Sequence, residues 1–204
     1  MPQFKLTYYN LRNHAEPARL IFQYTGQAFE DVRIPREKWP EMKNISETGK
    51  LPFLDVDDER VYESAALTRY LGHIFGLAGK DEMEDAQIDS IVDTYKDFFA
   101  DARIYHSVKR GRVEGNLEEL RQKYDETCKK WYTYLQSHLD KSNTGFIASK
   151  LSWADFVLAE GILTMKNFDE EFAEKYPKIL EYKNRIHAHP KIKNYIESRE
   201  NLNY

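Results

Sequence analysis

The first 79 residues carry short apolar segments whose spacing is that of strands in some places and of helices in others. Phe4, Leu6 and Tyr8 alternate with polar neighbours, which predicts a half-buried strand. A helical spacing follows, with Pro17 in its first turn and Gly26 as its stop. The same criteria predict three more strands and a second helix, over residues 29–34, 51–56, 60–62 and 64–75.

From residue 82 onward the spacing is helical throughout. Apolar residues recur every three or four positions over residues 88–99 and again over 117–139. Ser152 stands three residues before Asp155, which predicts a helix that begins with a capping box. The stretch 77–82 lies between the two patterns and is expected to be a linker.

The order of these elements predicts two domains. Strand–helix–strand followed by strand–strand–helix is the order of a thioredoxin-like α/β domain with a mixed four-stranded sheet. We therefore expect a thioredoxin-like domain over residues 1–79 and an all-α domain over residues 82–204.

Composition narrows the classes of protein to consider. Lys and Arg number 30 against 34 Asp and Glu, and this net charge of −4 argues against a nucleic-acid partner. No apolar run is long enough for a membrane span, and the first residues have no basic n-region or apolar h-region, so we expect no secretory leader. The single cysteine, Cys128, excludes an internal disulfide, so we expect a soluble cytoplasmic protein. Cys128 falls on the long apolar stripe and should lie in the core, whereas Tyr132 is off it and should be at the surface or in an interface.

Tyr8 is the first candidate for chemistry. A tyrosine at the end of a first strand, facing the loop Gly49-Lys50-Leu51-Pro52, is the layout of a thioredoxin-like glutathione site without a cysteine. A free thiol, with a pKa of about 8.5, is only a few per cent thiolate at neutral pH. A hydroxyl donor that lowers this pKa by about two units, roughly 2.7 kcal/mol, makes thiolate the main species. We expect Tyr8 to be that donor.

Pro52 begins the third predicted strand. Only about 5–6% of X–Pro bonds are cis in folded proteins, so a trans bond is the default. In a thioredoxin-like domain, a cis proline here frees the preceding backbone amide and carbonyl to pair with a bound peptide. The order of elements favours a cis Leu51–Pro52 bond.

Glu63-Ser64 directly precedes the second predicted helix, with Ser64 as its expected cap. A helix N-terminus also binds anions through its free amides and its dipole. The γ-glutamyl carboxylate of glutathione fits Ser64, and its ammonium fits Glu63. Lys43, Lys50 and Trp39 could hold the other carboxylate and the peptide backbone.

At these residues the chain resembles the cytosolic glutathione S-transferases of the sigma class. It is most similar to the nematode members and to the related haematopoietic prostaglandin D synthase. The resemblance runs nearly end to end and rests on the Phe-Lys-Leu-Thr-Tyr-Tyr opening, Trp39-Pro40, Gly49-Lys50-Leu51-Pro52, Glu63-Ser64, Arg69-Tyr70-Leu71, Ile91-Val92-Asp93 and Trp153-Ala154-Asp155-Phe156.

This resemblance implies a homodimer that uses glutathione as co-substrate, with Tyr8 as the catalytic residue. Asp97 is implied to reach the glutathione from a partner subunit. The other implied glutathione contacts are His14, Trp39, Lys43, Gly49, Lys50, Leu51, Pro52, Glu63 and Ser64. The electrophile site is expected in the helical domain and near Tyr8, from Asn10, Leu11, Ile104 and Tyr105.

Two departures from the family pattern bear on function. Where the family carries Arg-Gly-Arg-Ala-Glu, this chain has His14 in place of the second arginine. Histidine titrates at about pH 6.5, so thiolate activation is expected to be weaker or more pH-sensitive, unless His14 is simply a solvated loop residue. Ile104 replaces a tryptophan of the prostaglandin synthases, and Lys96 interrupts their interfacial carboxylate cluster, so no metal site is expected.

We therefore interpret the chain as a glutathione transferase that conjugates the thiolate to hydrophobic electrophiles, with peroxide reduction through the same thiolate. The first alternative is a non-catalytic carrier of haem or other flat lipophiles. The second is a glutathione-dependent prostaglandin D synthase, which the loss of the tryptophan makes less favourable.

Overall fold

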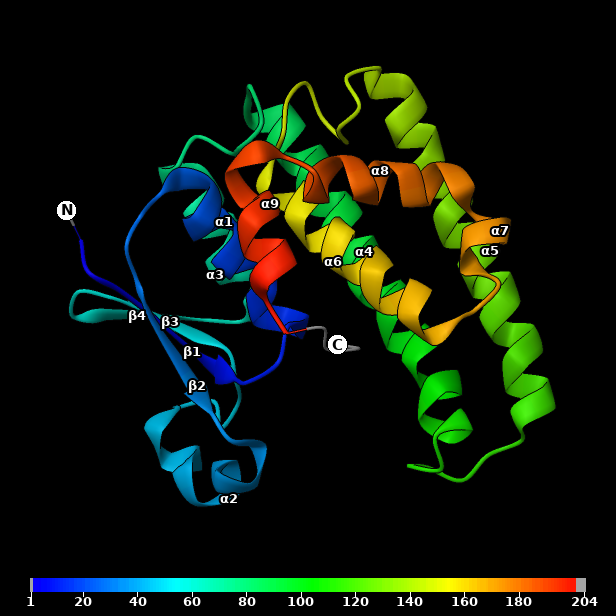
Figure 1. Ribbon diagram of the computed structural model, residues 1–204, viewed down its shortest axis with the longest axis horizontal. Coiled ribbons are helices and arrows are strands. Elements are labelled where there is room, and N and C mark those ends of the chain that lie inside the picture. The colour runs from blue at the N-terminus through cyan, green and yellow to red at the C-terminus, as the bar shows by residue number, and fades with distance from the viewer. Residues whose placement is uncertain (1, 201–204) are drawn as a thin grey trace.

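The computed structural model describes residues 2–200 and shows a small α/β domain beside a larger helical one (Figure 1). The four strands lie in the order β2 (Glu30–Ile34), β1 (Phe4–Tyr9), β3 (Phe53–Val56) and β4 (Glu59–Tyr62). β1 runs parallel to β2 and antiparallel to β3, which is itself antiparallel to β4. The predicted thioredoxin-like domain with a mixed four-stranded sheet is confirmed.

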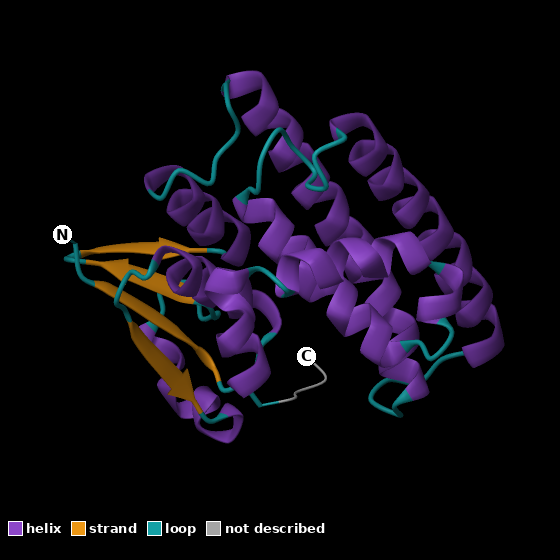
Figure 2. Cartoon of the chain, turned by 45° about the horizontal axis from the view of Figure 1, so that its top comes forward, coloured by secondary structure: helices purple, strands orange, loops and turns teal. Residues whose placement is uncertain are grey.

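Helices α1 (Glu16–Thr25) and α3 (Ser64–Ile74) contact each other on the side of the sheet that faces the helical domain (Figures 1 and 2). α1 ends at Gly26, whose φ of 70° is left-handed, as the sequence predicts. The prediction that Ser64 caps α3 is wrong, because Glu63 occupies the N-cap and Ser64 is already helical.

The segment between β2 and β3 contains an element that the sequence pattern does not reveal. It forms the short helix α2 (Trp39–Met42), between 3₁₀ turns at 36–38 and 43–45. A helix of four residues has too few positions to show a period, which explains why it is missed.

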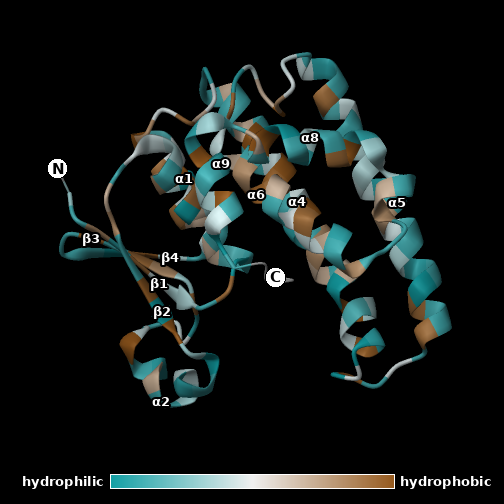
Figure 3. Cartoon of the chain, viewed as in Figure 1, coloured by the Kyte–Doolittle hydropathy of each residue, from teal (hydrophilic) through white to brown (hydrophobic). Residues whose placement is uncertain are grey.

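The remaining helices are α4 (Glu82–Lys109), α5 (Leu117–Ser142), α6 (Trp153–Phe168), α7 (Phe172–Lys175), α8 (Pro177–His187) and α9 (Pro190–Ser198). α4 packs along α5, and α6 contacts α1, α3, α4 and α8. Hydrophobic residues are prominent on this central α6, while the outer helices carry hydrophilic surfaces (Figure 3). Within residues 2–200, no helix is both long and apolar enough to cross a membrane.

The two domains meet where α3 crosses α6. A Cβ atom on Gly72 of α3 would stand 2.6 Å from Cδ1 of Trp153, which is fully buried. Glycine therefore lets the two helices approach closely at this point. The backbone amide of Trp153 also donates a hydrogen bond to the carbonyl of Leu77, at 2.9 Å, from the start of α6 to the linker.

The predicted capping box at α6 is confirmed and is part of a larger buried network. Asp155 accepts hydrogen bonds from the Ser152 backbone amide at 2.7 Å and from the Ser152 hydroxyl at 2.8 Å. It also accepts from the Tyr182 hydroxyl of α8 and from the Ile147 amide, at 2.7 and 3.1 Å. One carboxylate thus joins the start of α6, the preceding loop and α8.

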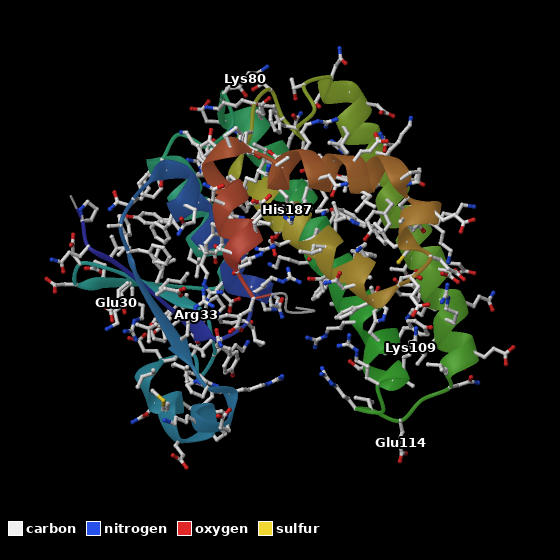
Figure 4. All side chains as sticks on the ribbon, viewed as in Figure 1. Glu30, Arg33, Lys80, Lys109, Glu114 and His187 are labelled. Carbon is white, nitrogen blue, oxygen red and sulfur yellow. The ribbon has the colours of Figure 1, made fainter. Side chains whose placement is uncertain are left out.

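A second buried network connects the domains through charged groups. Glu160 of α6 pairs with Arg12 at 2.5 Å and with Arg199 at 2.9 Å, and Arg199 pairs with Glu16 of α1 at 2.6 Å. His187 lies 3.0 Å from Glu160, near the centre of the molecule where α8 meets α6 (Figure 4). Burial raises the pKa of Glu160, but the nearby His187, Arg199 and Arg12 hold this pKa below its usual range.

Two expectations for α5 have different outcomes. Cys128 is buried, as predicted, and burial raises the pKa of its thiol to about 12. Tyr132 is only 2% exposed in the single chain, so the expected surface or interface position is wrong. It packs between Phe98 of α4 and Phe172 of α7, because α5 is covered on two sides rather than one.

Candidate active site

The loop before β3 and the start of α3 form one wall of a cavity between the domains. The Leu51–Pro52 bond is cis, as predicted. The cavity has a volume of ≈ 510 Å³, and its lining includes the predicted residues His14, Lys50, Leu51, Pro52, Glu63 and Ser64. The opposite wall comes from α4 and α6, including Tyr95, Lys96, Phe99, Arg103 and Glu160.

The backbone at Glu63 shapes the end of this first cavity. Glu63 has a φ of 67° and a ψ of 121°, a conformation that residues with a side chain rarely adopt. Ser64 follows as the first residue of α3, and no side chain caps this helix. The first amides of α3 are therefore available for an anionic group of a ligand.

A second cavity of ≈ 390 Å³ adjoins the first. The two share the lining residues Asn13, His14, Phe99, Arg103 and Thr164. Of these two cavities, Tyr8, Leu11 and Ile104 line only the second. A ligand in the first cavity and a ligand in the second would meet at the shared wall.

Tyr8 lies near the carboxyl end of β1, paired with Arg33 of β2 in the sheet. Its side chain is only 3% exposed, and its ring contacts that of Tyr9 with centroids 5.2 Å apart. Burial raises the pKa of Tyr8 to about 12, although the hydrogen bond with the His14 backbone lowers it. The phenol is therefore protonated at neutral pH and has a hydrogen to donate.

His14 lies on the wall that the two cavities share. Its ring meets Phe99 edge-on, with centroids 6.4 Å apart. Desolvation by the surrounding protein lowers the pKa of His14, the charge of Arg103 lowers it further, and Glu63 raises it. His14 is consequently neutral at pH 7 and supplies no fixed positive charge.

Several other predicted residues lie outside the linings of both cavities. Trp39 is buried and meets Tyr9 edge-on, and Asn10 accepts a hydrogen bond from Arg33 at 3.0 Å. Tyr105 is only 6% exposed and stacks on a core tyrosine of α5, so its ring turns away from the second cavity. Lys43, Gly49 and Asp97 also line neither cavity, and the side chains of Lys43 and Asp97 are exposed.

Sequence reasoning missed other lining residues of the second cavity, including Tyr9, Arg36, Phe99, Arg103, His106 and Phe168. Three residues of α4, namely Phe99, Arg103 and Ser107, recur at intervals of four residues on one helix face. This spacing is present in the sequence, but it cannot reveal which neighbouring element the face meets.

The arrangement defines a class of protein. A thioredoxin-like domain with a cis proline, an open helix N-terminus and a tyrosine hydroxyl beside a second cavity is the architecture of glutathione-dependent enzymes that act on a second substrate. Within residues 2–200, no group of three or more His, Cys, Asp or Glu side chains could hold a metal ion.

Comparisons with known proteins identify the family. Residues 6–79 match the N-terminal domain and residues 99–199 the C-terminal domain of the glutathione S-transferases. The chain is 39% identical over 206 residues to glutathione S-transferase 1 of Ascaris suum, with 100% of both chains covered. It resembles a Nu-class enzyme of Haemonchus contortus (34% identity, TM-score 0.90, 100% of both chains) and monomeric Na-GST-3 of Necator americanus (33%, 0.90, 99% and 100%). The chain belongs to the glutathione S-transferase family, whose enzymes use glutathione as co-substrate.

His14→Arg is expected to lower the thiol pKa of bound glutathione by about one unit, because a fixed positive charge favours the thiolate. The measurement is the pH dependence of thiolate absorbance in the binary complex. His14→Gln is the matched control and should leave this pKa nearly unchanged, since His14 is already neutral at pH 7. An unchanged thiol pKa in His14→Arg would contradict the expectation that the missing arginine charge weakens thiolate formation.

Proposed function

We propose that this glutathione transferase conjugates glutathione to hydrophobic electrophiles, with Tyr8 stabilising the thiolate. The observation that carries the proposal is the position of Tyr8, a buried and protonated phenol in a cavity that adjoins the proposed glutathione site. Its hydroxyl donates to the sulfur, and the anion attacks an electrophilic carbon. Most of the rate enhancement comes from positioning and from charge stabilisation.

Glutathione is proposed to occupy the first cavity, and residues 1–79 to be the domain that binds it. Its γ-glutamyl carboxylate lies on the N-terminus of α3 at Ser64, and its ammonium lies near Glu63. The main chain of Leu51 pairs with the peptide like an added strand. The electrophile then occupies the second cavity, against Leu11 and Ile104, with residues 82–204 supplying most of its outer wall.

Turnover of a chromogenic aromatic halide, with and without glutathione, tests this proposal. Conjugation should require glutathione and should saturate with both substrates. A protein that binds glutathione but conjugates neither aryl halides nor unsaturated carbonyls would favour the non-catalytic carrier of haem-like lipophiles instead. Cumene hydroperoxide tests the accompanying peroxidase activity, and prostaglandin D formation that requires glutathione would favour the isomerase.

A sigma-class homodimer in the cytoplasm is proposed, with Asp97 of the partner subunit at each glutathione site. Asp97 is exposed on α4 and lines neither cavity of its own chain, which supports a role across an interface. The relative Na-GST-3 is described as monomeric, so the state of assembly needs its own measurement. Sedimentation equilibrium should give twice the chain mass of 24.2 kDa, and a single-chain mass at micromolar concentration would refute the dimer.

A further inference from the structure

The two cavities differ in the charges that line them. The first carries both signs, with Lys50 and Lys96 opposed by Glu63 and Glu160, which suits a peptide with charges of both signs. Among residues 2–200, the second is lined by Arg36, Arg103, Arg110 and Arg112 and by no aspartate or glutamate. This concentration of positive charge is notable in a chain whose net charge is −4.

Arg36 and Arg103 are the best-placed cations of the second cavity. Arg36 begins the 3₁₀ turn after β2, close enough to Tyr8 and Tyr9 for its charge to lower the pKa of both phenols. Arg103 projects from α4 at the wall between the two cavities. Among residues 2–200, no carboxylate forms an ion pair with either guanidinium.

The rest of the second cavity suits a long apolar group. Leu11, Ile104, Val113 and Phe168 contribute apolar surface, and the Arg110 guanidinium lies 4.2 Å from the centre of the Phe168 ring. His106, which is largely buried, also belongs to the lining.

We infer that the second cavity selects electrophiles that carry a carboxylate on an apolar chain, and that Arg36 and Arg103 bind this carboxylate. The inference rests on the proposed conjugating function and adds the substrate class to it. Guanidinium groups bind carboxylates through charge-assisted hydrogen bonds, while the apolar wall accepts the chain. Unsaturated carbonyl derivatives of fatty acids have this chemistry.

The reaction on such a substrate is a conjugate addition. The thiol first loses its proton to water, and the Tyr8 hydroxyl stabilises the resulting thiolate. The sulfur then forms a bond to the β-carbon of the unsaturated ketone, and the π electrons of the double bond move toward the carbonyl. A proton from water completes the α-carbon, so the product is the sum of the two substrates and no oxidant is needed.

The test compares a long-chain enone that ends in a carboxylate with its methyl ester. Wild-type kcat/KM should favour the acid by about tenfold, shared between the two guanidinium contacts. Arg103→Gln and Arg36→Gln should each lower this acid-to-ester ratio by about threefold, and Arg103→Lys should retain part of it. Both substrates react with the same thiolate, so any effect of an arginine on the thiol cancels in the ratio.

Lys130→Gln is the matched control, because Lys130 is an exposed cation of α5 that lines neither cavity. It should leave the acid-to-ester ratio unchanged, whereas added salt should lower this ratio in the wild type. A wild-type ratio near one, or a ratio that Arg103→Gln and Arg36→Gln leave intact, would overturn the inference.

A binding measurement separates this inference from the proposed function. Calorimetry with dodecanoate and with methyl dodecanoate needs no turnover. The acid should bind about tenfold more tightly than the ester to the wild type, and this preference should fall in Arg103→Gln and in Arg36→Gln. Equal affinities would overturn the inference while leaving conjugation of neutral substrates intact. Selective binding of the acid without any conjugation would instead refute the proposed function and retain the anion site.

Discussion

Replacing Tyr8 with phenylalanine is expected to lower the kcat of conjugation about a hundredfold at pH 7, the equivalent of roughly 2.7 kcal/mol. The phenol stays protonated because burial raises its pKa to about 12, so its contribution is the hydrogen bond that it donates to the sulfur. Without this donor the thiol pKa of bound glutathione should return toward that of the free thiol. Single-turnover kinetics as a function of pH measure both the rate of conjugation and the thiol pKa of bound glutathione.

The affinity for glutathione should change little in Tyr8→Phe, because the proposed peptide contacts lie in the first cavity and Tyr8 does not line it. Tyr24→Phe is a suitable control, since it removes a hydroxyl from another tyrosine of the same domain that lines neither cavity. A Tyr8→Phe enzyme with normal kcat and a normal pH profile would refute thiolate stabilisation by this residue.

Replacing Asp155 with alanine is expected to lower the free energy of unfolding by about 3–5 kcal/mol, the range for breaking a buried charged network. The substitution removes the acceptor for Ser152, Ile147 and Tyr182 at once and leaves these donors buried without a partner. Urea unfolding followed by circular dichroism gives the value.

Asp140→Ala provides the comparison for this measurement, because Asp140 is exposed near the end of α5 and accepts a hydrogen bond from the side chain of Gln136 on the same helix. It should change the free energy of unfolding by less than about 0.5 kcal/mol. Equal effects of the two substitutions would show that the network at the start of α6 contributes no special stability.

Local patterns predicted most of the fold because they act over a few residues. Alternation located β1, Gly26 stopped α1, and the spacing of Ser152 and Asp155 marked the start of α6. The same reasoning failed for Ser64, since the left-handed φ of Glu63 moves the start of α3 by one residue. Such a backbone conformation has no signal in hydrophobic spacing.

The candidate site was predicted unevenly, and the reason is again the range of the interactions. Residues of the cis-proline loop and the start of α3 line the first cavity because their local geometry is typical of the fold. Tyr105 was expected beside the electrophile, but the rotation of α4 turns it into the core and presents Ile104 and Arg103 instead. A single helix pattern does not define that rotation when apolar residues surround much of the helix.

The sequence by itself determined the fold class, the elements of the small domain, the cis proline and the identity of Tyr8 as a candidate donor. Only the tertiary structure decided that His14 is neutral, that Tyr132 is buried and that Arg36 and Arg103 meet at one cavity. Spacing records which residues share a face of one element. The charge state of a group and the composition of a cavity depend on neighbours from distant parts of the chain, and those neighbours are set by packing.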